Sequence, residues 1–211
     1  MTSFNVDLVN RDYEFKMGQY FSRGWQIFTA YGWQFVLFTL IYLGLSLAVS
    51  QVFPETLAVI FNNIITPVLG VGYLCVAFQI ARGRPKTFAD FFGGFRKFLP
   101  VLLTSLVSSL LICLGLILLV IPGIYLAVAY VFAQPLVIDK HLDFWSAMET
   151  SRRIITKKWF SFFGLGLLLF LLILVSLMAL GVGILVGAPL ASCIIAAAYE
   201  DIVGLNSVAE P

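Results

Sequence analysis

Long uncharged apolar runs follow one another along the chain and predict membrane-spanning helices. The runs cover residues 33–50, 58–81, 100–121, 124–138, 160–180 and 183–199. A helix needs about 20 mostly apolar residues to cross a hydrocarbon core of roughly 30 Å. The pattern therefore predicts an all-α polytopic membrane protein with six transmembrane helices arranged as three hairpins.

The fourth run is short, and only Pro122-Gly123 separates it from the third. Two interpretations stay open: a tight hairpin between two crossings, or a single re-entrant element. We favour the hairpin because residues 100–138 together are long enough for two crossings, and a Pro-Gly pair suits a sharp turn. Gly181-Val182-Gly183 is expected to form the equivalent turn between the last two runs.

Basic residues fall only in the segments that one side of this layout would share. All 13 Lys and Arg precede the first run, connect the second to the third, or connect the fourth to the fifth, whereas Glu55 is the only charge on the opposite side. Loops rich in Lys and Arg stay in the cytoplasm. We therefore expect both termini to be cytoplasmic.

Each basic segment is also amphipathic at the helical period. In the third, Phe144, Trp145 and Met148 share one face, whereas Glu149 and Arg153 lie on the other. A strong moment with aromatic and basic residues is typical of a helix that lies in the membrane interface. The sequence thus predicts a cytoplasmic interfacial amphipathic helix before each hairpin.

This order of an interfacial helix followed by a hairpin occurs three times. It suggests a three-fold internal repeat over residues 14–82, 87–139 and 143–201, although degenerate apolar repeats also arise by chance. No linker divides the chain, so residues 14–203 are predicted to form a single domain between cytoplasmic tails at 1–13 and 204–211.

Composition excludes a water-soluble fold, because 61% of the residues are hydrophobic and only 11% are charged. The predicted spans contain no ionisable group, so their polarity is limited to amides and hydroxyls. Gln79 and Gln134, near the inner ends of two outgoing spans, are the candidate intramembrane polar sites. Gly183, Gly187 and Ala191 form a small-residue stripe for helix packing, within the chain or in a homo-oligomer.

The basic clusters at the inner leaflet are the better candidates for binding. Anionic headgroups attract such residues by roughly 1 kcal/mol each, although orientation and anchoring alone also explain them. The candidate contacts to anionic lipid or to a partner protein are Arg82, Arg84, Lys86, Arg96, Lys97, Arg152, Arg153, Lys157 and Lys158.

Catalytic motifs are not evident in the sequence. The single histidine, His141, has no metal-ligand spacing with other residues, and no phosphate loop or nucleophile elbow occurs. An intramembrane enzyme would require His141, Glu200 and Asp201 to converge. We therefore expect no catalytic residues, no metal, no cofactor and no nucleic-acid partner.

Three motifs carry a family resemblance: residues 90–95 (DFFGGF), 121–125 (IPGIY) and 198–201 (AYED). Between roughly Tyr20 and Ile202 the chain resembles uncharacterised bacterial inner-membrane proteins. That group is similar to the membrane domain attached to some glycerophosphodiester phosphodiesterases. The resemblance implies a six-span domain in a bacterial cytoplasmic membrane, and it implies no activity because no phosphodiesterase domain is present.

Together these features predict a non-enzymatic inner-membrane protein that interacts with lipids or a partner membrane protein through its cytoplasmic helices. The alternative is a transporter or channel for a small or amphiphilic solute, with a pathway lined by Gln79, Gln134 and the intramembrane hydroxyls.

Overall fold

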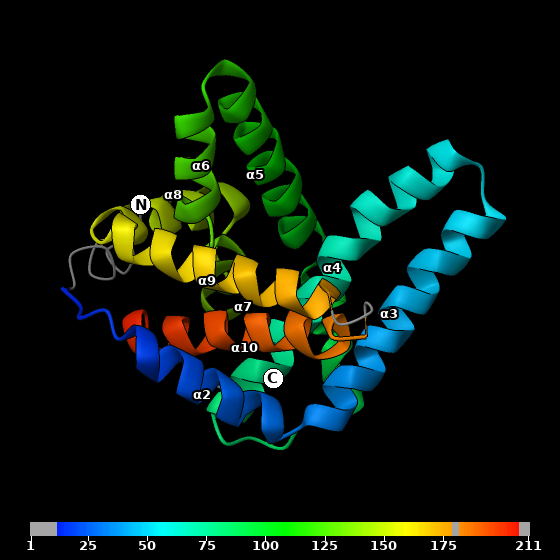
Figure 1. Cartoon of the computed structure of the whole chain (residues 1–211), viewed down its shortest axis with the longest axis horizontal. Helices are drawn as coiled ribbons and strands as arrows, with labels where there is room; N and C mark the ends of the chain where they lie inside the picture. Colours follow the sequence, from blue (N-terminus) through cyan, green and yellow to red (C-terminus); the bar gives the residue numbers. More distant parts are fainter. Residues whose placement is uncertain (1–11, 179–181, 207–211) are drawn as a thin grey trace.

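The computed structural model describes residues 12–178 and 182–206, and every regular element in them is helical (Figure 1). The elements are α2 (Met17–Thr29), α3 (Gly32–Val52), α4 (Glu55–Ala81), the 3-10 helix η1 (Phe88–Lys97), α5 (Phe98–Leu118), α6 (Val120–Ala129), α7 (Ala133–Lys140), α8 (Phe144–Thr156), α9 (Trp159–Met178) and α10 (Ile184–Ile202). This confirms the prediction of an all-α fold.

Six helical stretches are long and apolar enough to cross a membrane, as the sequence predicts. They are α3, α4, η1 with α5, α6 with α7, α9, and α10. They support a multi-pass membrane protein. Their arrangement as three hairpins across a bilayer stays a prediction, although α3 and α4 are joined within the chain by a 2.9 Å hydrogen bond from Ser46 Oγ to Asn62 Oδ1.

The six stretches differ in how deeply they are buried. In α3, in η1 with α5, and in α9, only 17–22% of the most apolar window is buried, whereas the share is 44–50% in α4, in α6 with α7, and in α10. The second group supplies the centre of the core, where Phe78, Leu136 and Tyr199 are each at most 1% exposed. The first group surrounds it and presents apolar side chains outward, as a lipid-facing surface requires.

Amphipathic helix α2 buries its apolar face against α10 rather than leaving it uncovered. Figure 1 shows α2 running alongside α10. A Cβ on Gly24 would lie 2.6 Å from Ile194, so glycine permits this close approach. Arg23 pairs with Glu200 of α10 at 3.2 Å, which stabilises the same contact.

The other two amphipathic elements also pack against a helix of the buried group. A Cβ on Gly72 of α4 would collide with the carbonyl oxygen of Phe91 in η1. Ser151 of α8 donates to the Ala129 carbonyl oxygen at 2.7 Å and accepts from the Phe132 amide, which bridges the break between α6 and α7. Helices η1 and α8 thus pack on the outgoing helix that precedes them in the chain, and α2 packs on the last one. The three-fold repeat itself stays a prediction.

Each outgoing helix is followed closely by a residue with left-handed backbone: Gly83 (φ 66°), His141 (φ 56°) and Gly204 (φ 78°). A left-handed residue commonly ends a helix and satisfies its last carbonyl groups. Here it turns the chain into the next segment at the level where the basic residues lie.

The turn predicted at Pro122-Gly123 is misplaced. Helix α5 ends at Leu118, Leu119 is extended (φ −157°, ψ 132°), and α6 begins at Val120. Proline is tolerated in the first helical turn because the backbone amides there have no intrahelical acceptor. Gly123 instead allows α6 to approach α5, since a Cβ on Gly115 would lie 2.9 Å from Gly123.

Two residues expected in the tails contact the domain. Tyr13 donates from its hydroxyl to the Ile154 carbonyl oxygen at 2.8 Å, and Asn206 donates from its backbone amide to Asp139 at 3.2 Å. The remainder of both predicted tails, and Gly181 of the predicted Gly181-Val182-Gly183 turn, lie outside the described residues.

Candidate functional site

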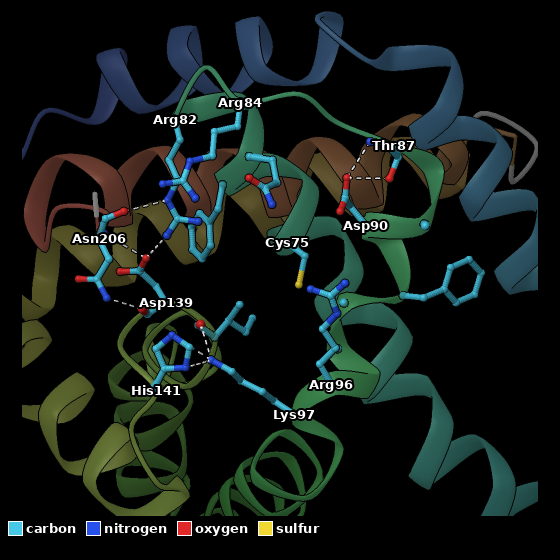
Figure 2. Close-up of a pocket in the computed structure, with 17 residues that line it drawn as sticks. Cys75, Arg82, Arg84, Thr87, Asp90, Arg96, Lys97, Asp139, His141 and Asn206 are labelled. Atoms are coloured by element: carbon cyan, nitrogen blue, oxygen red, sulfur yellow. Dashed lines mark hydrogen bonds and ion pairs between the residues drawn. The ribbon is translucent and has the colours of Figure 1, made fainter. Parts of the chain in front are cut away.

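A cavity of about 400 Å³ lies where the end of α4, η1 and the end of α7 meet (Figure 2). We call it the collar pocket. It is lined by Cys75, Phe78, Gln79, Arg82, Arg84, Thr87, Ala89, Asp90, Phe92, Gly93, Gly94, Arg96, Lys97, Ile138, Asp139, His141 and Asn206.

Positive charge dominates the lining of this pocket. The four cationic side chains are Arg82, Arg84, Arg96 and Lys97, and the carboxylates are Asp90 and Asp139. With His141 neutral, the formal excess is two positive charges. Four of the nine predicted basic contacts therefore converge on one cavity, together with Gln79.

Asp139 organises one wall of the collar pocket. It is the only charged residue among the buried residues that the structure describes, and its side chain has no exposed area. Its carboxylate accepts from the Arg82 guanidinium, from Tyr199 Oη at 3.1 Å and from Lys140 Nζ at 3.1 Å. A buried carboxylate needs such charged and polar partners, because desolvating it alone would be strongly unfavourable.

Asn206 ties the chain after α10 to the same wall. Its side-chain amide donates to the Asp139 carbonyl oxygen at 2.6 Å, and its Oδ1 accepts from Lys140 Nζ at 2.7 Å. Arg82 Nε donates to the Asn206 carbonyl oxygen at 3.1 Å. Arg82 and Lys140 are thus held by an anionic, carbonyl-rich wall, which offsets much of their charge.

Asp90 is also committed to a local role. Its Oδ2 accepts from the Thr87 backbone amide at 2.7 Å and from the Thr87 hydroxyl at 3.1 Å. This capping box fixes the start of η1, and with it the direction of the following residues. The sequence signal, Thr followed three residues later by Asp, was available but was not used.

The opposite wall presents cations from the end of η1. Lys97 Nζ donates to the Ile138 carbonyl oxygen at 3.0 Å and lies 3.3 Å from His141 Nε2. Arg96 has no hydrogen-bond or ion-pair partner among residues 12–178 and 182–206. Figure 2 shows Arg96 and Lys97 on one side of the pocket, across from Arg82, Asp139 and His141.

Lys86 lies away from the pocket. Its Nζ donates to the Ala30 carbonyl oxygen at 3.2 Å and lies 5.3 Å from the centre of the Tyr31 ring. It therefore links the loop after α4 to the end of α2.

The other predicted basic cluster lies around α8. Arg152 and Arg153 both pair with Glu149, at 2.8 and 2.6 Å, and Lys158 stacks 5.6 Å from the centre of the Tyr13 ring. Hydrogen bonds from the two guanidinium groups lower the pKa of Glu149 to about 2. Lys157 is exposed and also belongs to this cluster. The structure thus separates the two basic clusters, which the sequence treats alike.

The other predicted positions are distributed over the fold. Gln79 lines the collar pocket, whereas Gln134 lines a separate groove between α5 and α7. Gly183 and Gly187 approach Ser176 of α9 so closely that a Cβ on either would collide with it, and Ala191 is partly buried. The small-residue stripe is therefore engaged in packing within the chain.

The three residues that an enzyme would require have different partners. Glu200 pairs with Arg23, Asp201 accepts from Tyr20 Oη at 3.0 Å, and His141 lies beside Lys97. Burial and the nearby Asp201 carboxylate raise the pKa of Tyr20 to about 12. Among the described residues, no three His, Cys, Asp or Glu side chains come close enough to hold a metal ion.

Comparison of the chain with protein-family models, curated protein sequences and solved structures finds no match in any of the three. The site is therefore interpreted from its own residues.

Proposed function

We propose that this multi-pass membrane protein binds phosphate-bearing anions in the collar pocket, and that its ligands are anionic lipid headgroups at the cytoplasmic face. The observation that carries the proposal is the convergence of Arg84, Arg96 and Lys97 around one cavity. In that cavity the carboxylates of Asp90 and Asp139 are already engaged by protein donors.

The chemistry of the lining supports a phosphate ligand. Guanidinium groups present several N–H donors in a planar fork that matches phosphate oxygens, and an ammonium adds a point charge. A cation near an anionic headgroup contributes about 1 kcal/mol. Phe92 and Phe95 are exposed beside these cations, and aromatic rings favour the headgroup region of a bilayer.

The proposal includes an orientation. With all 13 Lys and Arg on one side, both termini face the cytoplasm of a bacterial cell, and the collar pocket meets the inner leaflet of the cytoplasmic membrane. The resemblance to bacterial inner-membrane proteins supports the same location. A green fluorescent protein fused after Pro211 should fluoresce, whereas alkaline phosphatase at that position should be inactive.

The binding test compares two double substitutions of equal charge. Purified protein is titrated with short-chain phosphatidylglycerol, and affinity is measured for wild type, Arg96→Gln/Lys97→Gln and Arg152→Gln/Arg153→Gln. At about 1 kcal/mol per cation, the first variant should bind about 30-fold more weakly. The second should bind within about threefold of wild type, because Glu149 already pairs with both of its arginines.

Two further arms identify the source of the phosphate. Zwitterionic phosphatidylcholine should bind weakly to all three proteins, and inorganic phosphate should compete only at high concentration if a lipid headgroup is the ligand. Equal loss of binding in the two double variants would contradict the pocket, because it would mean that the charges act as a general anchor.

A further inference from the structure

A second cavity, of about 250 Å³, lies between α5 and the α6–α7 pair, within the membrane-spanning stretches. We call it the hydroxyl groove. Its polar lining is Thr104, Ser105, Ser108, Ser109, Tyr130 and Gln134, and its other lining residues are apolar. No charged side chain lines it among the residues that the structure describes, which distinguishes it from the collar pocket.

Gln134 presents a hydrogen-bond acceptor of fixed identity. Its Nε2 donates to the Val101 carbonyl oxygen at 3.2 Å, so the orientation of the amide is set by that bond. Its Oε1 is buried and has no partner within the described chain. The position therefore lacks a donor.

Ser108 differs from the other serines and threonines of the spanning helices. Several of these donate to the carbonyl oxygen four residues earlier and are satisfied within their own helix: Thr39, Ser50, Thr104, Ser109, Ser176 and Ser192. Ser108 Oγ is buried and makes no hydrogen bond to a described residue. The neighbouring Ser109, on the same groove, is thus its natural control.

Two unpartnered polar atoms in one intramembrane groove need an explanation. A buried polar group without a partner costs about 1–3 kcal/mol, and lipid chains offer it no hydrogen bond. A group that satisfies both atoms must donate to Gln134 Oε1 and must exchange a hydrogen bond with the Ser108 hydroxyl. An alcohol does both, whereas an ester or ether oxygen can only accept.

We propose that the hydroxyl groove binds the alcohol group of a neutral amphiphile. The ligand's O–H donates to Gln134 Oε1, and its oxygen accepts from the Ser108 hydroxyl. Both protein atoms lie under the surface of the groove, so the Ser108 side chain rotates toward the ligand when it binds. The uncharged lining disfavours a phosphate here, so this site is independent of the collar pocket and takes a different class of ligand.

The test uses a matched pair of photoreactive probes: a medium-chain alcohol carrying a diazirine, and its methyl ether. Both are irradiated with the full-length protein in detergent, and the labelled peptides are quantified by mass spectrometry. Because one or two hydrogen bonds separate the probes, the alcohol should label residues 104–112 about 3- to 10-fold more than the ether does.

An apolar cavity of about 300 Å³, lined by Phe53, Leu57, Ile60, Phe61, Ile64 and Ile65, serves as the internal reference. It offers no polar side chain, so the two probes should label it equally. A preference for the alcohol at this reference would mean that the difference arises from partitioning, and it would overturn the proposal.

Substitutions complete the test. Ser108→Ala removes an atom that has no partner, so the fold should persist, and the labelling ratio of alcohol to ether should fall about threefold or more. Ser109→Ala should leave the ratio unchanged, because that hydroxyl is satisfied by Ser105. Equal labelling of the groove by both probes, or an unchanged ratio in Ser108→Ala, would show that no alcohol is recognised.

Discussion

Two basic clusters with nearly the same composition have different surroundings in this protein. Arg82, Arg84, Arg96 and Lys97 come from two separate elements and line a single cavity. Arg152 and Arg153 lie side by side on α8, with 38% and 43% of their side chains exposed, and share the Glu149 carboxylate. The first cluster forms a concave site, and the second forms a partly neutralised surface.

The difference arises from the elements that carry the charges. The collar pocket depends on a turn at Gly83, a capping box that directs η1, and the close packing of η1 on α4. The α8 cluster needs only helical spacing, since residues three and four positions apart are neighbours on one face. A concave site thus requires tertiary structure, whereas a charged face requires only a helix.

The largest expected effect breaks the wall of the collar pocket. Asp139→Asn keeps the size of the side chain but removes the charge that compensates Arg82 and Lys140. Removing one partner of a buried ion pair destabilises a protein by about 3–5 kcal/mol. Thermal or denaturant unfolding of the purified protein in detergent should show this loss.

Glu149→Gln is the matched control on the other cluster. It removes a carboxylate that also pairs with two cations, but both arginines are more than one-third exposed. Exposed pairs contribute about 0–1 kcal/mol, so this variant should unfold close to wild type. If the two variants lost equal stability, the distinction between a buried and a surface network would be wrong.

A smaller effect should follow when the packing of η1 on α4 is disturbed. A Cβ on Gly72 would collide with the carbonyl oxygen of Phe91, so Gly72→Ala should force η1 away from α4. Overpacking of this kind costs about 1–3 kcal/mol, and anion binding in the collar pocket should weaken with it. Unfolding and the phosphatidylglycerol titration measure the two effects on the same sample.

Gly70 provides the control on the same helix. A Cβ there would meet no atom within 4 Å, so Gly70→Ala should be neutral or stabilising by up to about 1 kcal/mol. A destabilisation equal to that of Gly72→Ala would show that helix propensity, rather than the contact with Phe91, sets the effect.

The sequence predicts the six long helices because each depends on a local run of apolar residues. It does not predict what covers the amphipathic faces. A face with Tyr20, Gly24 and Ile27 fits a membrane interface and a protein contact equally well, and the structure places it against α10. The same pattern therefore overstates how much of the molecule lies flat on the membrane.

The candidate site is only partly predictable for a similar reason. The cationic residues and Gln79 are found by their position at the inner ends of the spans. The roles of Asp139 and Asn206 are not, because they depend on contacts between segments 67 positions apart. Asp139-Lys140 at the end of an apolar run was a usable signal for a buried ion pair.

The smallest expected effect concerns the pH dependence of the α8 cluster. Arg152 and Arg153 lower the pKa of Glu149 from 4.5 to about 2, so the folded state favours the ionised carboxylate. The stabilisation is fully present above about pH 4.5 and is lost as the pH falls toward 2. Between pH 5 and pH 3, wild type should therefore lose slightly more unfolding free energy than Glu149→Gln, by less than about 1 kcal/mol.

Salt tests the same pair in a second way, because screening acts on exposed charges more than on buried ones. Raising the ionic strength to about 1 M shortens the Debye length to about 3 Å, and it should reduce the difference between wild type and Glu149→Gln. The destabilisation by Asp139→Asn should persist at the same ionic strength, because its carboxylate has no exposed area. A loss of both effects in salt would mean that Asp139 belongs, like Glu149, to the solvent-exposed surface.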